Sequence, residues 1–166
     1  MSTFEIRANN YLTAIQTSSQ RINDFGYADE EPEEVVSRIY SSFVVWLTAC
    51  EEARAQQRLG TNNASFGRDV VEALPLADDP SWGTYIQPLP NTTLRARAEG
   101  LWGIRVAATH GDGDLLKIRS ARNRGYASNA PNVLPGLTIR NDNLYVSSGV
   151  THYAVRTIVQ IQDVLL

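Results

Sequence analysis

The feature that most constrains the fold of this chain is a long amphipathic segment between Pro32 and Gly60. Proline is tolerated in the first turn of a helix, and Glu33 and Glu34 complement the helix dipole there. Roughly 28 residues at about 1.5 Å each give a helix of about 42 Å, which suits the spine of a helical bundle or a dimer interface. Apolar residues recur at three- and four-residue steps along one face of this segment: Val36, Ile39, Tyr40, Phe43, Leu47 and Cys50.

The same periodicity predicts four more helices, which are separated by glycine, proline and polar stretches. They are expected over residues 4–22, residues 66–74, a segment from Asn91 or Thr92 to Gly111, and a segment from near Gly149 to residue 165. We expect Gly26 to end the first of these helices. Gly111 is expected to adopt the left-handed conformation that ends the fourth helix along the chain. The proline-rich stretch 75–90 is predicted to be an extended connection.

The region between the last two predicted helices has a different composition. Residues 119–136 are rich in asparagine, glycine, serine and proline, and we predict a loop there. Segments 137–140 and 144–147 flank Asn141-Asp142-Asn143, which is typical of a short β-hairpin because Asn and Asp tolerate a positive φ. The chain is therefore predicted to be all-α, a single domain over residues 1–166 with four to five bundled helices and a small β-hairpin before the last helix.

Composition narrows the classes of function. The 166 residues are 43% hydrophobic and 20% charged, as in a soluble globular protein. No apolar run approaches the roughly 18 residues that cross a bilayer, and the first residues lack the pattern of a signal peptide, so we expect a cytoplasmic protein without membrane contact. Cys50 is the only cysteine, which excludes an internal disulfide and a cysteine-based zinc cage. With a net charge of −3, any RNA site must be a local basic patch.

The run from Arg105 to His110, followed by Gly111, is the strongest candidate for chemistry. Arginine can hold a phosphate with two parallel hydrogen bonds, and histidine exchanges protons near neutral pH. These two groups are sufficient in principle to cut RNA without a metal. Five residues on a helix turn through about 500° and rise about 7.5 Å, so the two side chains point about 140° apart. They are poorly placed to close on one phosphate, whereas a two-fold homodimer can combine residues of both chains in one cleft.

The position of His110 at a helix end permits two interpretations. The negative pole of the helix dipole and the following Asp112 and Asp114 favour the protonated imidazolium, which suits general acid–base catalysis. A histidine before a helix-ending glycine is also an ordinary capping device. Taken alone, the spacing favours capping over catalysis.

The segment from Trp102 to Asp114, WGIRVAATHGDGD, resembles the Arg-x4–6-His motif of HEPN domains. It is similar to a branch of small stand-alone HEPN proteins of plasmids and mobile elements, and the predicted helical layout is similar too. The resemblance implies a metal-independent endoribonuclease that acts as a homodimer, often as a toxin or in phage defence, with Arg105 and His110 as the catalytic pair. It implies RNA as substrate, no cofactor, and a possible antitoxin or defence-system partner. Active members commonly carry a polar residue after the motif arginine, where this chain has Val106, and some HEPN domains are non-catalytic scaffolds.

Three further groups of residues are weaker candidates. Arg119, Arg122 and Arg124 lie beside Tyr126, an interleaving of cations with an aromatic ring that occurs in contacts with single-stranded RNA. His152 and Arg156 lie one turn apart on the last predicted helix and form a second possible phosphate contact. For both groups, a solvated polar surface is the more common explanation. His110, Asp112 and Asp114 offer alternating ligands for a hard metal, although a flexible acidic turn has the same composition.

Three functions therefore remain open. The first is a metal-independent HEPN ribonuclease in which Arg105 stabilises the phosphate charge and His110 transfers a proton. The second is a non-catalytic HEPN-like dimer that binds a protein or RNA. The third is a metal-dependent hydrolase centred on His110, Asp112 and Asp114.

Overall fold

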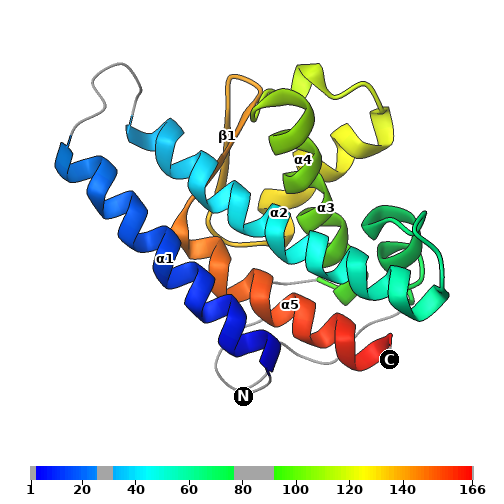
Figure 1. Ribbon diagram of the computed structural model, residues 1–166. Helices are drawn as coiled ribbons and strands as arrows, with labels where there is room; N and C mark the ends of the chain where they lie inside the picture. Colours follow the sequence, from blue (N-terminus) through cyan, green and yellow to red (C-terminus); the bar gives the residue numbers. More distant parts are fainter. Residues whose placement is uncertain (1–2, 26–31, 77–91, 166) are drawn as a thin grey trace.

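The computed structural model describes residues 3–25, 32–76 and 92–165, and these form a mostly helical fold with one small hairpin (Figure 1). The two long helices are α1 (Thr3–Phe25) and α2 (Pro32–Leu59), followed by the six-residue π-helical turn η1 (Phe66–Val71). The remaining elements are α3 (Leu94–Gly111), the 3-10 turn η2 (Leu115–Lys117), α4 (Ala121–Val133), strands β1 (Leu137–Arg140) and β2 (Asn143–Val146), the 3-10 turn η3 (Ser148–Val150) and α5 (Thr151–Val164). The all-α prediction with a hairpin before the last helix is confirmed.

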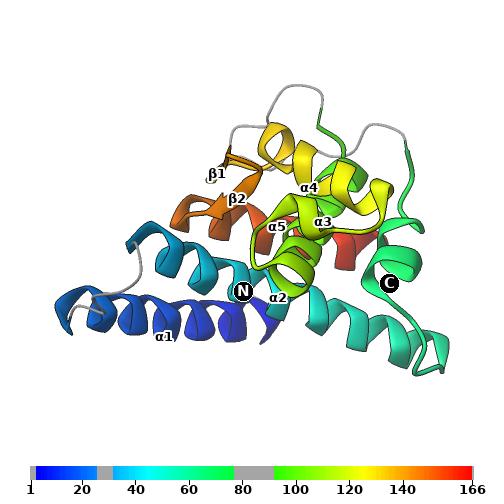
Figure 2. The ribbon, with the colours of Figure 1, turned by 90° about the horizontal axis from the view of Figure 1, so that it is seen from above.

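The long helix α2 is the centre of the packing, as its length predicts. It contacts α1 on one side and both α3 and α5 on the other, while α4 packs on the far side of α3 (Figure 2). Fully buried apolar side chains of α2, α3 and α5 form much of the core between these layers: Phe43, Val44, Leu47, Leu101, Ile104, Ile158 and Ile161. The predicted start at Pro32 and stop before Gly60 are confirmed, since Gly60 adopts a φ of 66°.

The predicted loop over residues 119–136 is wrong, because most of it forms α4. Ser120 caps this helix, with its hydroxyl accepting a hydrogen bond from the Asn123 N–H at 3.2 Å. Tertiary packing outweighs the poor helix propensity of the segment. Gly103 of α3 has no side chain, so the backbone of α4 comes so close that a Cβ on Gly103 would lie 2.5 Å from the Ala127 nitrogen.

The ends of α3 also differ from the prediction. Thr93 caps its start, with its hydroxyl accepting a hydrogen bond from the Ala96 N–H at 3.1 Å, whereas we expected Asn91 or Thr92. Asn91 lies outside the described residues, as do Gly26 and most of the predicted connection 75–90. Gly111 is the last helical residue rather than the left-handed one. Asp112 takes that conformation, with a φ of 50°, and the N–H groups of Asp112 and Gly113 both reach back to the Ala107 carbonyl, the latter at 3.0 Å.

The hairpin is confirmed and ties the end of α3 in place. Asn141 and Asp142 both have positive φ, 51° and 60°, which gives a two-residue turn of the type preferred in hairpins, and Asn143 belongs to β2. The Leu144 N–H donates to the Gly113 carbonyl at 2.8 Å, and the Leu115 N–H donates to the Asp142 carbonyl at 2.8 Å. The residues that directly follow α3 are therefore fixed against the turn end of the hairpin.

Candidate functional site

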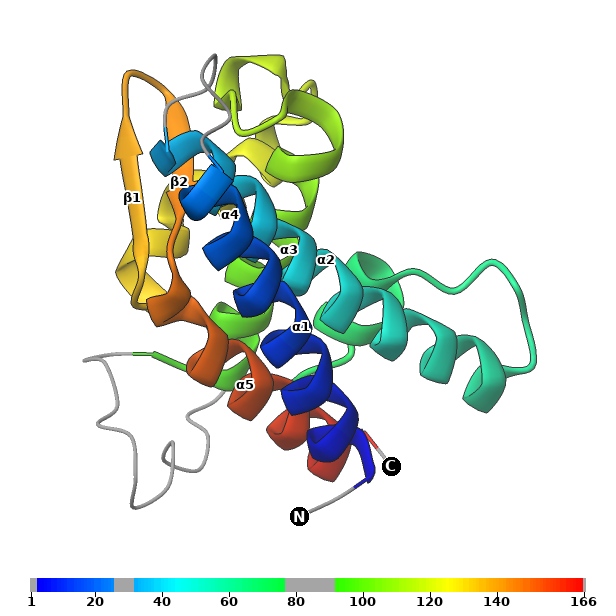
Figure 3. The same ribbon diagram turned by 60° about the vertical axis from the view of Figure 1, so that its left-hand side comes forward.

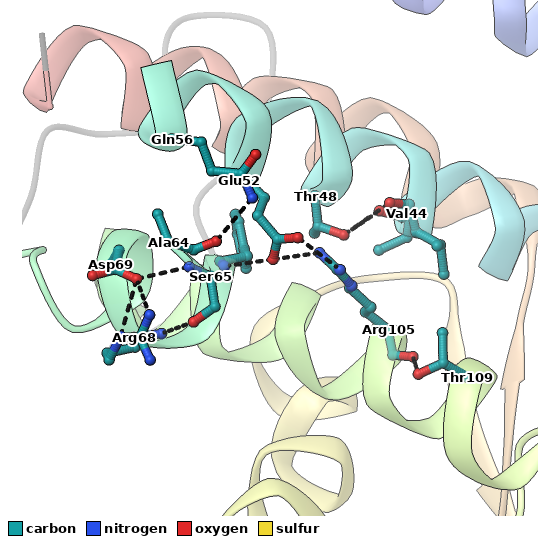
Figure 4. A network of polar contacts seen from close by, with 12 residues as sticks. Val44, Thr48, Glu52, Gln56, Ala64, Ser65, Arg68, Asp69, Arg105 and Thr109 are labelled. Carbon is teal, nitrogen blue, oxygen red and sulfur yellow. Dashed lines mark hydrogen bonds and ion pairs between the residues drawn. The ribbon is translucent and has the colours of Figure 1, made fainter. Parts of the chain in front are cut away.

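Arg105 lies in the second turn of α3 from its C-terminal end and points across to α2. One guanidinium nitrogen donates to the Glu52 carboxylate (Nη2 to Oε1, 3.3 Å), and a second lies 3.3 Å from the other oxygen (Nη1 to Oε2) (Figure 4). The guanidinium also lies over the Trp102 ring, 5.4 Å from its centroid. The two side chains are only 19% and 22% exposed, so the pair is partly shielded from water.

Glu52 joins three elements through one carboxylate. Besides Arg105, it accepts a hydrogen bond from the backbone N–H of Phe66 at 2.9 Å, so that α2, η1 and α3 are held together (Figure 4). One turn further along α2, the Gln56 side chain donates to the Ala64 carbonyl at 3.2 Å. Glu52 was not predicted as a site residue. A row of polar residues at helical spacing on α2, ending at Glu52, is the signal that could have revealed it: Glu34, Arg38, Ser41, Thr48 and Glu52.

One donor of Arg105 is left unsatisfied. Nη1 is buried and makes no hydrogen bond with acceptable geometry, although it is close to the Glu52 carboxylate. An unsatisfied buried donor costs free energy, on the order of 1–3 kcal/mol. The charge of this nitrogen is nevertheless balanced, because Glu52 Oε2 lies 3.3 Å away.

His110 lies at the exposed C-terminal turn of α3. No hydrogen bond or ion pair of its imidazole is found within residues 3–25, 32–76 and 92–165, and none joins it to Arg105. Arg105 faces α2 whereas His110 faces solvent, as the five-residue spacing predicts. A single chain therefore does not assemble the two side chains into one site.

A groove of about 590 Å³ opens beside the last turn of α3. Its walls come from the first half of α2, the end of α3, η2 and β2. Polar side chains dominate the lining: Glu34, Ser37, Arg38, Ser41, Ser42, Thr109, Asp112, Asp114, Lys117, Asn143 and Tyr145. Thr109 and Gly111, the neighbours of His110 in sequence, both contribute to the wall. The groove was not predicted, because its walls come from segments that are distant in sequence.

The three candidate RNA-binding arginines have different environments. Arg124 donates to the Ile118 carbonyl at 3.2 and 2.6 Å, which makes it a link within the fold. Arg122 pairs with Glu72 at 2.7 Å and donates to the Tyr126 hydroxyl at 2.7 Å, contacts that raise the pKa of its guanidinium. Arg119 is exposed and has no partner among the described residues. Of this group, Arg119 alone presents an uncommitted charge.

His152 and Arg156 lie one turn apart on α5, as predicted, with His152 exposed and Arg156 half-buried. The structure does not bring them to His110. The Asn143 end of β2 pairs with Asp114 near the end of α3, whereas α5 begins after the opposite end of that strand (Figure 3). Any role of these residues is therefore separate from the groove.

Asp112 and Asp114 have structural partners. Asp112 pairs with Arg38 at 3.4 Å, and the Asp114 carboxylate accepts from the Leu116 N–H at 3.0 Å to cap η2. In the part of the chain that the structure describes, no group of three or more His, Cys, Asp or Glu side chains is arranged to hold a metal. Among the described residues, His110, Asp112 and Asp114 are therefore not arranged as such a group.

Comparison of the chain with protein-family models, curated proteins and solved structures gives no match in any of the three. Over the described residues, no helix combines the length and the hydropathy that crossing a membrane requires.

Proposed function

We propose that this chain is a metal-independent endoribonuclease, similar to HEPN proteins, that acts as a homodimer with Arg105 and His110 as its catalytic pair. The observation that carries the proposal is the contrast between the two side chains on α3. Arg105 is held in a fixed, partly shielded position by Glu52, and His110 is presented to solvent without a partner in the described chain. A toxin or phage-defence effector, controlled by an antitoxin or a defence-system partner, fits this activity.

The chemistry follows from the two groups. The 2′-hydroxyl of RNA attacks the adjacent phosphorus, the bond to the 5′-oxygen breaks, and the products are a 2′,3′-cyclic phosphate and a 5′-hydroxyl. Arg105 stabilises the charge that builds on the phosphate oxygens. His110 accepts the proton of the 2′-hydroxyl or donates one to the leaving oxygen. Two chains related by a two-fold axis supply Arg105 from one copy and His110 from the other in each site.

Purified protein incubated with total RNA, in EDTA and in magnesium, tests this function. Cleavage in EDTA that leaves 2′,3′-cyclic phosphate ends is the expected result. Cleavage in magnesium alone would favour the metal-dependent hydrolase. Absence of cleavage under both conditions would overturn the ribonuclease proposal.

The Arg105–Glu52 pair favours a second candidate, a non-catalytic HEPN-like dimer. In that case the ion pair is purely structural and His110 only ends α3. Size-exclusion chromatography with light scattering then shows a dimer that binds RNA or a protein, without cleavage. The two candidates therefore share the homodimer and differ in catalysis.

A further inference from the structure

The groove beside the end of α3 has the dimensions and polarity of a ligand site. Its volume of about 590 Å³ lies within the roughly 300–1,000 Å³ that is usual for small-molecule pockets. Hydroxyl and amide groups from α2, the end of α3 and β2 face it, together with the Tyr145 ring. An apolar occupant would leave the groups that lack a partner inside the protein without hydrogen bonds, so the lining favours a polar ligand.

Several of the polar groups already have partners inside the protein. The Ser37 hydroxyl accepts from the Val146 N–H at 2.9 Å, Ser42 donates to the Arg38 carbonyl at 2.8 Å, and Thr109 donates to the Arg105 carbonyl at 2.8 Å. The remaining hydrogen-bonding capacity comes mainly from Glu34, Ser41 and Lys117. No hydrogen bond or ion pair of these three side chains is found among the described residues. As far as the described residues go, the groove therefore offers a carboxylate, a hydroxyl and an ammonium group without partners.

The charged residues of the groove indicate which part of a nucleotide it can bind, the phosphate or the base. Arg38 and Lys117 are outnumbered by the carboxylates of Glu34, Asp112 and Asp114, so a phosphate is not favoured inside it. A nucleobase carries no net charge and meets both kinds of group. Guanine fits best, because its neighbouring N1–H and N2–H groups can donate together to the two oxygens of one carboxylate while its O6 and N7 accept from a cation. Adenine and cytosine offer a carboxylate only their exocyclic amino group.

We propose that this groove is a guanine-binding subsite that selects the RNA sequence next to the cleaved phosphate. The inference rests on the proposed function, because the wall of the groove includes both neighbours of His110, Thr109 and Gly111. The base enters the groove, with Glu34 as acceptor and Lys117 as donor, and the sugar and phosphate remain outside near His110. The ribonuclease then cuts beside guanosine in preference to other nucleosides.

The site can be tested by nuclear magnetic resonance. Amide chemical shifts of the isotope-labelled protein, in whichever oligomeric state it adopts, are followed while each of the four uncharged nucleosides is added. Guanosine should shift the amide signals of groove residues, including Gly113, Asn143 and Leu144, and should bind at least about tenfold more tightly than the other three. Equal shifts from all four nucleosides, or no shifts in the groove, would overturn the proposal. So would spermidine, used as a cationic probe, if it bound there and guanosine did not.

Two variants assign the binding to the groove. Ser41→Phe fills it from α2 and should abolish the guanosine shifts, whereas Ala53→Phe, at an exposed position of the same helix, should leave them unchanged. Lys117→Ala changes an exposed side chain without a partner in the described chain, so the fold is retained, and guanosine affinity should fall about tenfold. Unchanged affinity in both Ser41→Phe and Lys117→Ala would contradict the assignment.

The outcomes separate this inference from the ribonuclease itself. Guanosine binding without RNA cleavage would uphold the groove and overturn the ribonuclease. Cleavage that shows no preference for guanosine, and that Ser41→Phe leaves unchanged, would uphold the ribonuclease and overturn the groove.

Discussion

Glu52 and Arg105 face each other between α2 and α3, with the guanidinium Nη2 3.3 Å from the carboxylate Oε1. The two residues are separated by 53 positions in the chain. Their contact joins α2, the central helix of the core, to α3, which carries both Arg105 and His110. It also determines the direction in which the motif arginine points, away from His110 and toward η1, where Glu52 accepts from Phe66.

A double-mutant cycle measures this pair. Glu52→Gln, Arg105→Met and the double variant should give a coupling of about 0.5–1 kcal/mol in the free energy of unfolding, because both side chains are partly shielded from water. The exposed pair Glu33–Arg140, with side chains 55% and 51% exposed, is the matched control and should show no measurable coupling. Equal couplings in the two pairs would contradict the structural role of Glu52.

The approach of α3 and α4 predicts opposite effects at two helical glycines. Gly103→Ala places a Cβ 2.5 Å from the Ala127 nitrogen and should lower the free energy of unfolding by about 1–3 kcal/mol, as overpacking does. Gly125→Ala, in α4, meets nothing within 4 Å and should raise it by about 0.4–1 kcal/mol. Urea denaturation measures both variants. A neutral Gly103→Ala would mean that α4 does not pack closely on α3.

The α4 helix shows where prediction from sequence failed. Gly125, Asn129 and Pro131 each lower helix propensity, and the close packing of this helix on α3 depends on a residue of another segment, Gly103. The long helices and the hairpin were predictable because periodicity and turn residues are local signals. In contrast, the Glu52–Arg105 pair depends on how two helices pack, and neither the spacing within α3 nor that within α2 specifies it.

Glu51 should make stability depend on pH. It is 5% exposed on α2, and burial raises the pKa of its carboxyl, against the lowering effects of Gln162 and Arg54. Because the folded state binds the proton more tightly than the unfolded state, stability is highest below the ordinary glutamate value and falls as the pH rises through the raised pKa. Glu51→Gln keeps an acceptor for Gln162, and it should gain stability over the unsubstituted chain as the pH rises from about 4 to about 7.

Asp69 provides a control, because its pKa is shifted in the opposite direction to that of Glu51. The Ser65 backbone N–H and the Arg68 side chain lower the pKa of its carboxyl. Its contribution to stability is therefore present above the ordinary aspartate value and is lost as the pH falls through the lowered pKa. Asp69→Asn should destabilise the protein at neutral pH and lose this effect in acid. The same slope with pH in both variants, measured by urea denaturation, would contradict the two assignments.

Complementation between variants tests the composite site. Arg105→Lys keeps the charge but loses the two-pronged hydrogen bonding of arginine, and should impair cleavage, whereas Arg7→Lys at an exposed position of α1 should not. Mixing Arg105→Lys with His110→Ala should restore part of the activity, because one of the two sites in a mixed dimer then carries both native residues. Restoration should fail if each site takes both residues from one chain.

The most direct test of the central claim is the rate of RNA cleavage in EDTA by His110→Ala. Loss of proton transfer should lower the rate about 10²–10⁴-fold, while the stability changes by no more than about 1 kcal/mol, the effect of a charge at a helix end. Gln57→Ala, at an exposed position of α2, is the control and should cleave at the unsubstituted rate. Full activity in a His110→Ala protein would show that the histidine only ends α3, and would contradict the proposed mechanism.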